Sequence, residues 1–220
     1  MKIKETLQTE AEKLRSMSKK DRIWYIWEYY KFHILGILLA FIMLFNIGAA
    51  LYRSTFDTVL HCYFLNSQSP ELNLASAEEG FAAYAGLNEK QLLTLESGSA
   101  SFDASAGELE YAVLAKITAL VMSHDLDIII GDTASANHYA SLNGFADLET
   151  ILPEDLSARL KDRFYYAKDM DGAEFAFAID LSDTEFARRT GLLQDLPLLS
   201  VIAGSERKEM ATAFIRYIFQ

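Results

Sequence analysis

The longest apolar stretch of the chain runs from Ile34 to Tyr52 and holds no charged side chain. A helix of these 19 residues, at 1.5 Å per residue, is about 28 Å long, close to the ~30 Å hydrocarbon thickness of a bilayer. Eleven of the 19 are Leu, Ile or Phe, which together favour the membrane interior by about 3–7 kcal/mol and outweigh the polar Asn46. The pattern predicts a transmembrane helix over residues 34–52.

Aromatic and basic side chains precede this stretch. Rings with polar tips favour the lipid headgroup layer, and a lysine can extend its ammonium group towards it. The helix is predicted to begin near Lys19, because Ser18 and Asp21 have the spacing of a capping box. The residues expected at the membrane interface are Trp24, Tyr25, Trp27, Tyr29, Tyr30 and Lys31.

Charge divides the chain into unlike parts. Residues 1–33 carry eight basic against five acidic side chains, whereas residues 54–220 carry eleven basic against 26 acidic ones. By the positive-inside rule, we expect a cytoplasmic segment at 1–18, a long helix over 19–53 and an extracytoplasmic domain over 54–220. An acidic domain repels phosphate backbones, so the charge argues against nucleic-acid binding.

Two features of the N-terminal region leave alternatives open. A cleaved signal peptide is the rival of the anchor, and Gly48 and Ala50 supply a small-x-small pair for a peptidase. The apolar run exceeds the roughly 7–15 residues of a signal-peptide core, which favours an uncleaved anchor. Apolar residues also recur at helical spacing in residues 1–17, which fits either an amphipathic helix on the inner membrane surface or a solvated, frayed helix.

After Arg53, short apolar runs alternate with helical patterns, which is typical of an α/β fold. The run Ile128–Ile130 is typical of a parallel strand buried on both faces, whereas Asp171-Gly172 favours a hairpin between antiparallel strands. The sequence therefore predicts an α/β sandwich with a mixed sheet. The expected strands are 58–65, 91–96, 127–131, 164–168, 173–181 and 198–203, and the expected helices are 76–85, 108–123, 154–161, a turn ending near 190, and one that follows 205.

Finer expectations concern helix starts and buried faces. The expected N-terminal caps are Ser76, Ser182 or Asp183, and Ser205. The helix over 108–123 is expected to bury one face, formed by Leu109, Val113, Ile117, Leu120 and Val121. Cys62 is the single cysteine, which excludes an internal disulfide, and it is expected to pack as a buried hydrophobe. The four histidines are scattered, so no zinc site and no cofactor are expected.

Three segments resemble the type 2 periplasmic solute-binding-protein fold: Leu126–Asp132, Asn143–Leu148 and Leu198–Phe219. In that family a buried strand ends in a short acidic or polar turn, and a late strand leads into a helix. The resemblance extends over most of residues 57–220 and implies a reduced lobe of that fold, because the domain is short for two full lobes. The layout also resembles single-pass membrane proteins of Gram-positive bacteria whose anchor begins like Trp27–His33.

The candidate ligand-binding residues are Gly131, Asp132 and Thr133, which follow a buried strand, and Phe145 in a later loop. Loops at the carboxyl ends of parallel strands line the crevice in which open α/β sheets bind ligands. A plain turn or helix cap is the alternative for Asp132 and is favoured over a ligand contact. The segment His124–Asp127 fits a helix C-terminal cap better than a metal or acid–base cluster.

No serine or cysteine nucleophile motif, phosphate-binding glycine loop or pair of catalytic carboxylates is evident, so an enzyme is not expected. Two functions remain for a chain whose first partner is the lipid bilayer. One is an interaction or accessory module for another membrane or extracellular protein. The other is a tethered receptor for a small solute or peptide near Asp132. The short domain favours the first, whereas the Gly131-Asp132 turn favours the second.

Overall fold

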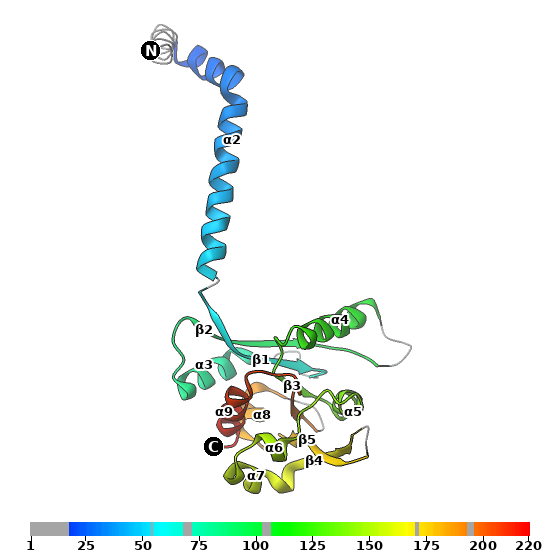
Figure 1. The fold of residues 1–220 in the computed structure, drawn as a ribbon. Helices are drawn as coiled ribbons and strands as arrows, with labels where there is room; N and C mark the ends of the chain where they lie inside the picture. The colour runs from blue at the N-terminus through cyan, green and yellow to red at the C-terminus, as the bar shows by residue number, and fades with distance from the viewer. Residues whose placement is uncertain (1–17, 54, 68–71, 103–106, 170–171, 193–195) are drawn as a thin grey trace. The chain divides into compact units, whose positions relative to one another are not determined.

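The computed structural model describes residues 18–53, 55–67, 72–102, 107–169, 172–192 and 196–220 (Figure 1). The chain divides into two compact units, Met1–Thr55 and Phe56–Gln220. The expected helix within residues 1–17 and the hairpin turn at 170–171 lie outside the described residues.

The first unit contains α2 (Lys19–Arg53), a helix of 35 residues that begins where the sequence predicts. Its segment Lys31–Tyr52 has a mean hydropathy of 2.5 and an exposed apolar surface. This is the length and composition of a membrane span, and a signal sequence near an N-terminus shares both properties.

The residues expected at the membrane interface all lie on α2. Trp24 and Trp27 are 67% and 63% exposed. Lys31 is half-buried, and its Nζ lies 5.7 Å from the centroid of the Phe32 ring. The side chains of Tyr25, Tyr29 and Tyr30 lie outside the description. The described rings and the lysine therefore sit on the helix surface next to the apolar segment.

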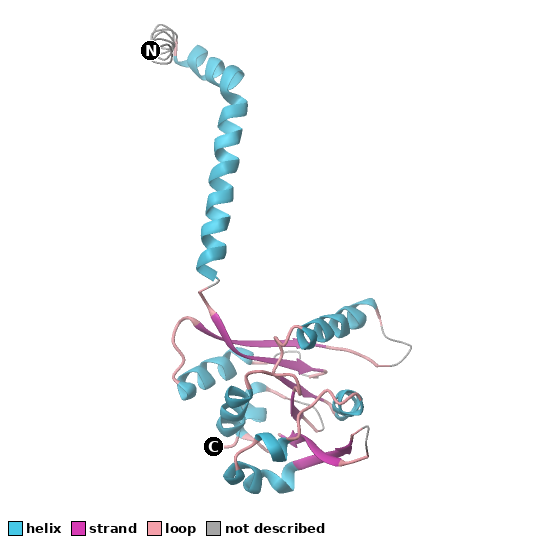
Figure 2. Ribbon diagram, in the orientation of Figure 1, coloured by secondary structure: helices cyan, strands magenta, loops and turns pink. Residues whose placement is uncertain are grey.

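The second unit is built on one mixed sheet (Figure 2). Within the described residues the strand order is β2-β1-β3-β6-β5-β4. Strands β2, β1 and β3 are parallel, whereas β6 is antiparallel to β3 and β5, and β4 is antiparallel to β5. This confirms the α/β class and the mixed sheet. The strands are β1 (Asp57–Leu65), β2 (Gln91–Gly98), β3 (Ile128–Gly131), β4 (Phe164–Lys168), β5 (Glu174–Asp180) and β6 (Leu198–Val201).

Helices cover both faces of the sheet. Face A, as we name it, packs against α3, α6, α7, α8 and α9, and face B packs against α4 and α5. The helices are α3 (Leu74–Ala85), α4 (Glu108–Met122), α5 (Thr133–Ser141), α6 (Leu148–Ile151), α7 (Glu154–Leu160), α8 (Glu185–Thr190) and α9 (Lys208–Ile218), and a 3-10 turn covers Lys161–Arg163.

The two-residue period of the strands divides the core between these faces. In β1, Leu60 and Phe64 point to face A, and Tyr63 and Leu65 point to face B. Cys62 points to face A and is fully buried, as predicted. Burial raises the pKa of the Cys62 thiol well above its ordinary value, so this side chain is a packing element rather than a nucleophile.

Several helix starts differ from the prediction. Asn73, not Ser76, caps α3, and its Oδ1 accepts from the Ser76 backbone N–H (3.1 Å). Thr184 caps α8 in place of Ser182 or Asp183. Ser205 does not cap the last helix, which begins at Lys208. In each case the helix starts one to three residues away from the predicted boundary, the usual error of reasoning from local sequence.

Two further corrections concern α5 and α4. Helix α5 is absent from the predicted elements because its small and polar residues show no apolar period. In α4, Ile117 is fully buried as predicted, but Leu109 is 83% exposed. Val113, Leu120 and Val121 are partly buried against face B, so the apolar period locates the buried face of α4 correctly except at Leu109.

Candidate functional site

The parallel part of the sheet contains a topological switch point. The connection from β1 to β2 passes over face A through α3, and the connection from β2 to β3 passes over face B through α4. The carboxyl ends of the three strands meet, since Leu65 pairs with Gly98 and Phe64 with Ile130. Open α/β sheets bind ligands in a crevice at such a point.

Asn66 organises this edge. It follows β1 directly and has a φ of 57°, a left-handed conformation that asparagine tolerates better than most residues. Its Oδ1 accepts from the Ala100 N–H (2.7 Å) and the Ser99 hydroxyl (3.2 Å). Its Nδ2 donates to Ser135 Oγ (3.0 Å) and Asp132 Oδ2 (3.3 Å). The Asn66 amide thus ties the ends of all three parallel strands together and has no spare donor for a ligand.

Asp132 is the N-terminal cap of α5. Its Oδ1 accepts from the Ser135 backbone N–H (2.9 Å), while Oδ2 accepts from Asn66. Gly131 beside it is buried, and Thr133 is exposed. The structure therefore brings these three predicted residues together at the switch point, and capping accounts for the Asp132 carboxylate.

Phe145 lies elsewhere. It forms a β-bridge with Ile202, which follows β6 and pairs near the amino end of β3, opposite the end that leads into Asp132. Four strand residues at about 3.3 Å each separate these two ends by roughly 10–13 Å. Phe145 is buried against Phe177 and Tyr139, and it lines a hollow of about 310 Å³ that also involves Phe175. The predicted set of four residues is thus split between two places.

A second polar centre lies at the amino end of β3, around Asp127, which the sequence placed in a helix C-terminal cap. Asp127 is fully buried, and three groups donate to its carboxylate: the His61 backbone N–H (2.8 Å), Ser205 Oγ (2.7 Å) and Arg207 Nε (2.8 Å). Arg207 also donates to the Asp125 carbonyl oxygen (2.8 Å). The centre joins β1, the start of β3 and the segment before α9. A buried carboxylate bound by this many donors is costly to disturb.

The His61 ring lies beside this centre, on face B. Its Nδ1 lies 3.0 Å from the Asp125 carbonyl oxygen, which can only accept, so Nδ1 carries the proton. Its Nε2 is buried without a hydrogen-bond partner among the described residues, 3.7 Å from Glu96 Oε1. Glu96 is itself paired with Lys116 of α4. Burial lowers the pKa of His61, and the attraction of Glu96 only partly offsets it.

In the segment that follows the exposed C-terminal end of α4, His124 makes the bonds of a helix cap as predicted, whereas Asp127 belongs to the buried polar centre. His124 has a φ of 59° just beyond α4, and its backbone N–H donates to the Val121 carbonyl. Its Nδ1 donates to the Gly204 carbonyl oxygen (2.7 Å). These are bonds of a helix C-terminus held against a neighbouring loop. Groups of three or more metal-ligating side chains are absent from the described residues.

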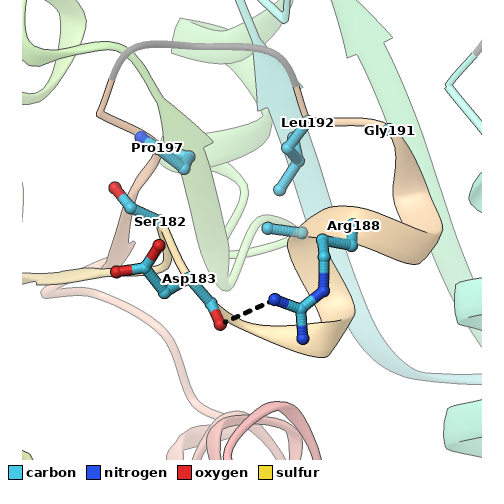
Figure 3. Close-up of a pocket in the computed structure, with 7 residues that line it drawn as sticks. Ser182, Asp183, Arg188, Gly191, Leu192 and Pro197 are labelled. Carbon is cyan, nitrogen blue, oxygen red and sulfur yellow. Dashed lines mark hydrogen bonds between the residues drawn. The ribbon is translucent and has the colours of Figure 1, made fainter.

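Several hollows open on the surface of the second unit. Figure 3 shows one of about 380 Å³ between α8 and the start of β6. Its arginine, Arg188, is engaged by its own neighbours, because it donates to Glu185 Oε2 (2.9 Å) and the Asp183 carbonyl oxygen (3.5 Å). Neither this hollow nor the one at Phe145 contains a residue of the switch point.

Helix α4 carries three of the large exposed apolar side chains of the second unit. Leu109, Tyr111 and Met122 are 83%, 55% and 76% exposed. The exposed residues between them include three alanines, and Lys116 pairs with Glu96 at the rim. Tyr111 and Met122 lie on one side of α4, whereas Leu109 lies about 140–160° around the helix at 100° per residue. Glu108, Lys116 and Thr118 are exposed as well, so the exposed surface of α4 is mixed, with large apolar side chains of the kind found at interfaces.

Comparison of the chain with protein-family models, with curated proteins and with solved structures finds no match in any of the three.

Proposed function

We propose that this chain is a single-pass membrane protein whose outer domain is a non-catalytic interaction module built on a reduced solute-binding-protein-like lobe. Three observations support the proposal: the apolar segment of α2, the hydrogen-bonded switch point and the exposed surface of α4. The exposed surface of α4 is the observation that supports the interaction function.

The membrane part rests on α2. Its apolar segment is exposed along its length, so water would solvate it at a high free-energy cost that a bilayer removes. Basic residues dominate the flank before it, and Arg53 is the single charge at its far end. This asymmetry favours a cytoplasmic N-terminus and an extracytoplasmic domain. The bilayer is then the first partner of the chain.

The lobe part rests on the sheet. The expected resemblance requires a parallel set of strands whose polar turns meet at one edge, and β1, β2 and β3 have that arrangement. At this edge the polar side chains bind one another: Asn66 uses its amide within the cluster and Asp132 caps α5. A site that satisfies its own hydrogen bonds has little left with which to recognise a solute.

The partner of α4 is inferred from the chemistry of this surface. Its large exposed apolar side chains are Leu109, Tyr111 and Met122, and tyrosine and methionine are enriched at protein interfaces. Glu108 and Glu110 lie in the first turn of the helix, on a strongly acidic domain. The surface therefore fits a protein with an apolar patch and basic residues around it.

The test places a photo-reactive benzoylphenylalanine at Met122 or at Leu109 in the full chain in its native membranes. We expect a discrete adduct from both positions after irradiation. Tyr84, which is 45% exposed on α3 of face A, is the matched control and is expected to give none. Equal adducts from Tyr84, or none from α4, would contradict a specific surface on this helix.

A second candidate function, reception of a small solute, is favoured by one observation. The Ser67 hydroxyl, next to Asn66, is buried without a hydrogen-bond partner among the described residues. A ligand at the switch point would satisfy it. Calorimetric titration of the full chain with amino acids, peptides and sugars tests this function, since a heat of binding that disappears in Ser67→Ala would establish the site.

A further inference from the structure

The apolar segment of α2 carries a second pattern besides its hydrophobicity. Leu35, Leu39, Ile42, Asn46 and Ala49 follow one another at alternating spacings of four and three residues. This is the a/d repeat by which two helices pack side by side with a left-handed crossing. Leu35, Leu39 and Ile42 are each about half exposed, and nothing in the described chain covers this face.

Asn46 stands at an a position of this repeat, and its hydrogen bonds are incomplete. Its Nδ2 donates to the Ile42 carbonyl oxygen one turn earlier (2.7 Å). An asparagine amide has two N–H groups and an oxygen that accepts up to two bonds. Within the described residues, the second N–H and the oxygen have no partner, and the side chain is exposed.

In the proposed membrane span, Asn46 lies at a depth where unpaired amide groups have a high free energy. It lies three residues past Met43, the midpoint of the segment 34–52, which is about 4.5 Å along the helix axis. The hydrocarbon layer extends about 15 Å to either side of its centre. Water is absent there, so unpaired amide groups cost free energy until another polar group meets them.

We infer that two copies of this chain associate side by side through this face, with the Asn46 amides donating to each other. Copies inserted with the same orientation place Asn46 at the same depth, so each amide meets a group that is both donor and acceptor. A single asparagine at an a position is also what fixes the register of parallel two-helix pairs. Ala49 leaves room for close approach one turn later. The inference rests on the proposed membrane anchor.

A competing face exists on the same helix. Gly36 and Ala40 form a small-x-x-x-small pair, the pattern of a right-handed crossing, and it faces away from Asn46 by about 100° at 100° per residue. This face offers no polar group, so it leaves the Asn46 amide in the hydrocarbon. The two faces can be separated by substitution.

The first experiment measures energy transfer between full chains in phosphatidylcholine vesicles. Donor or acceptor dyes are attached at Gln220→Cys, while the buried Cys62 stays unlabelled. We expect transfer that rises with the protein-to-lipid ratio. Asn46→Leu should weaken association about 3- to 30-fold, whereas Asn46→Gln, which keeps the amide, should retain it. Gly36→Leu should leave it unchanged.

Flotation of the same vesicles tests membrane anchoring separately from the pairing of the helices. All variants should float with the lipid, because Asn46→Leu makes the segment more apolar. A chain that fails to float would remove the anchor and the pairing with it. A chain that floats, yet shows transfer unaffected by Asn46→Leu or abolished by Gly36→Leu, would overturn the inference and leave the anchor standing.

A second measurement tests directly whether the a/d face of α2 lies at the contact between two chains. Oxidation of single-cysteine chains in membranes, with Cys62 replaced by alanine, compares Ile42→Cys with its neighbour Phe41→Cys. Both residues lie at the same depth, but only residue 42 belongs to the a/d repeat. We expect faster disulfide formation at residue 42. Equal rates, or faster linkage at residue 41, would contradict pairing on this face.

Discussion

The two faces of the sheet are packed differently. On face A, five helices enclose a core of aromatic and aliphatic side chains, in which the Phe81 ring meets the Phe214 ring edge-on at 4.9 Å. On face B, the described helices that cover the strands are α4 and α5, and the buried layer includes polar groups such as His61 and Ser200. Helix α4 also exposes the large apolar side chains Leu109, Tyr111 and Met122.

This difference indicates that face A stabilises the domain and that face B serves an interaction. Face A has the dense apolar packing that stabilises a small domain, and its helices present few large apolar residues outward. On face B, His61 Nε2 and Ser200 Oγ are buried without a hydrogen-bond partner in the described part of the chain, and α4 exposes large apolar side chains; both features cost stability. A domain retains such features where they serve an interaction. The following predictions test this division, in order of expected effect.

Phe214→Ala should have the largest effect. Phe214 is fully buried on face A and packs against Phe81 and Phe186, so its removal leaves a cavity. We expect the free energy of unfolding to fall by about 3–5 kcal/mol in urea titrations of residues 56–220. A loss below about 1 kcal/mol would show that face A does not hold the main core.

Ile117→Ala probes the inner side of α4. Ile117 is fully buried and is the centre of the contact of α4 with face B, to which Val113, Leu114, Leu120 and Val121 also contribute. We expect a loss of about 2–4 kcal/mol, measured in the same titrations. A loss above about 4 kcal/mol would contradict the contrast between the faces.

Asp132→Ala removes the cap of α5. Because the carboxylate accepts from the Ser135 backbone N–H and from Asn66, we expect a loss of about 0.5–2 kcal/mol. Asp132→Asn keeps an acceptor for the helix and is the matched control. If Asp132→Ala stabilised the domain, the Asp132 carboxylate would be destabilising in the folded state. It would then serve ligand binding rather than cap the helix.

The stability of the domain should depend on pH through His61. Burial holds the pKa of the folded His61 imidazole below 6.5, so the unfolded chain binds a proton first as the pH falls. The contribution of the neutral His61 ring to the free energy of unfolding is complete above about pH 6.5. It is lost as the pH falls from there towards the pKa of His61 in the folded domain. The melting temperature of the domain should therefore decrease as the pH is lowered from about 7.5 to about 5.5.

The control for this pH dependence is His61→Leu. This substitution leaves the backbone N–H that donates to Asp127 in place and removes the titrating ring. Its melting temperature should vary less over the same interval. An unchanged decline would assign the pH dependence to other groups.

Leu109→Ser should have the smallest effect on stability. Its side chain is 83% exposed, so we expect a change within about 0.5 kcal/mol. The same substitution should reduce the photo-adduct formed from residue 122, because it weakens the surface on which the partner binds. A stability loss comparable to that of Ile117→Ala would mean that Leu109 packs within the domain.

Local patterns explain which elements could be predicted from the sequence. The β4–β5 hairpin follows from Asp171-Gly172 between strand-forming runs, and the burial of β3 follows from three consecutive isoleucines. The start of α2 and the burial of Cys62 also follow from neighbouring residues. These features depend on chemistry within a few residues of each other.

The polar centres could not be predicted in the same way. Asp127 meets His61 and Arg207 across 66 and 80 residues of chain, and Asn66 meets Ala100 across 34. Such pairings depend on the strand order, which no local pattern encodes. Asn66 had one usable signal, since it follows a predicted strand at the edge where Asp132 was expected. The exposure of Leu109 depends on which neighbours are missing, and periodicity cannot report that.

The measurement that most directly tests a non-catalytic interaction module is a thermal-shift screen of residues 56–220 against amino acids, peptides, sugars, anions and divalent metals. A specific ligand at 100 times its dissociation constant adds about 2.7 kcal/mol, which is a rise of roughly 5–10 °C for a domain of this size. We predict one cooperative transition that no member of the panel shifts. A rise of that size with one chemical class would contradict the interaction module and identify a tethered solute receptor.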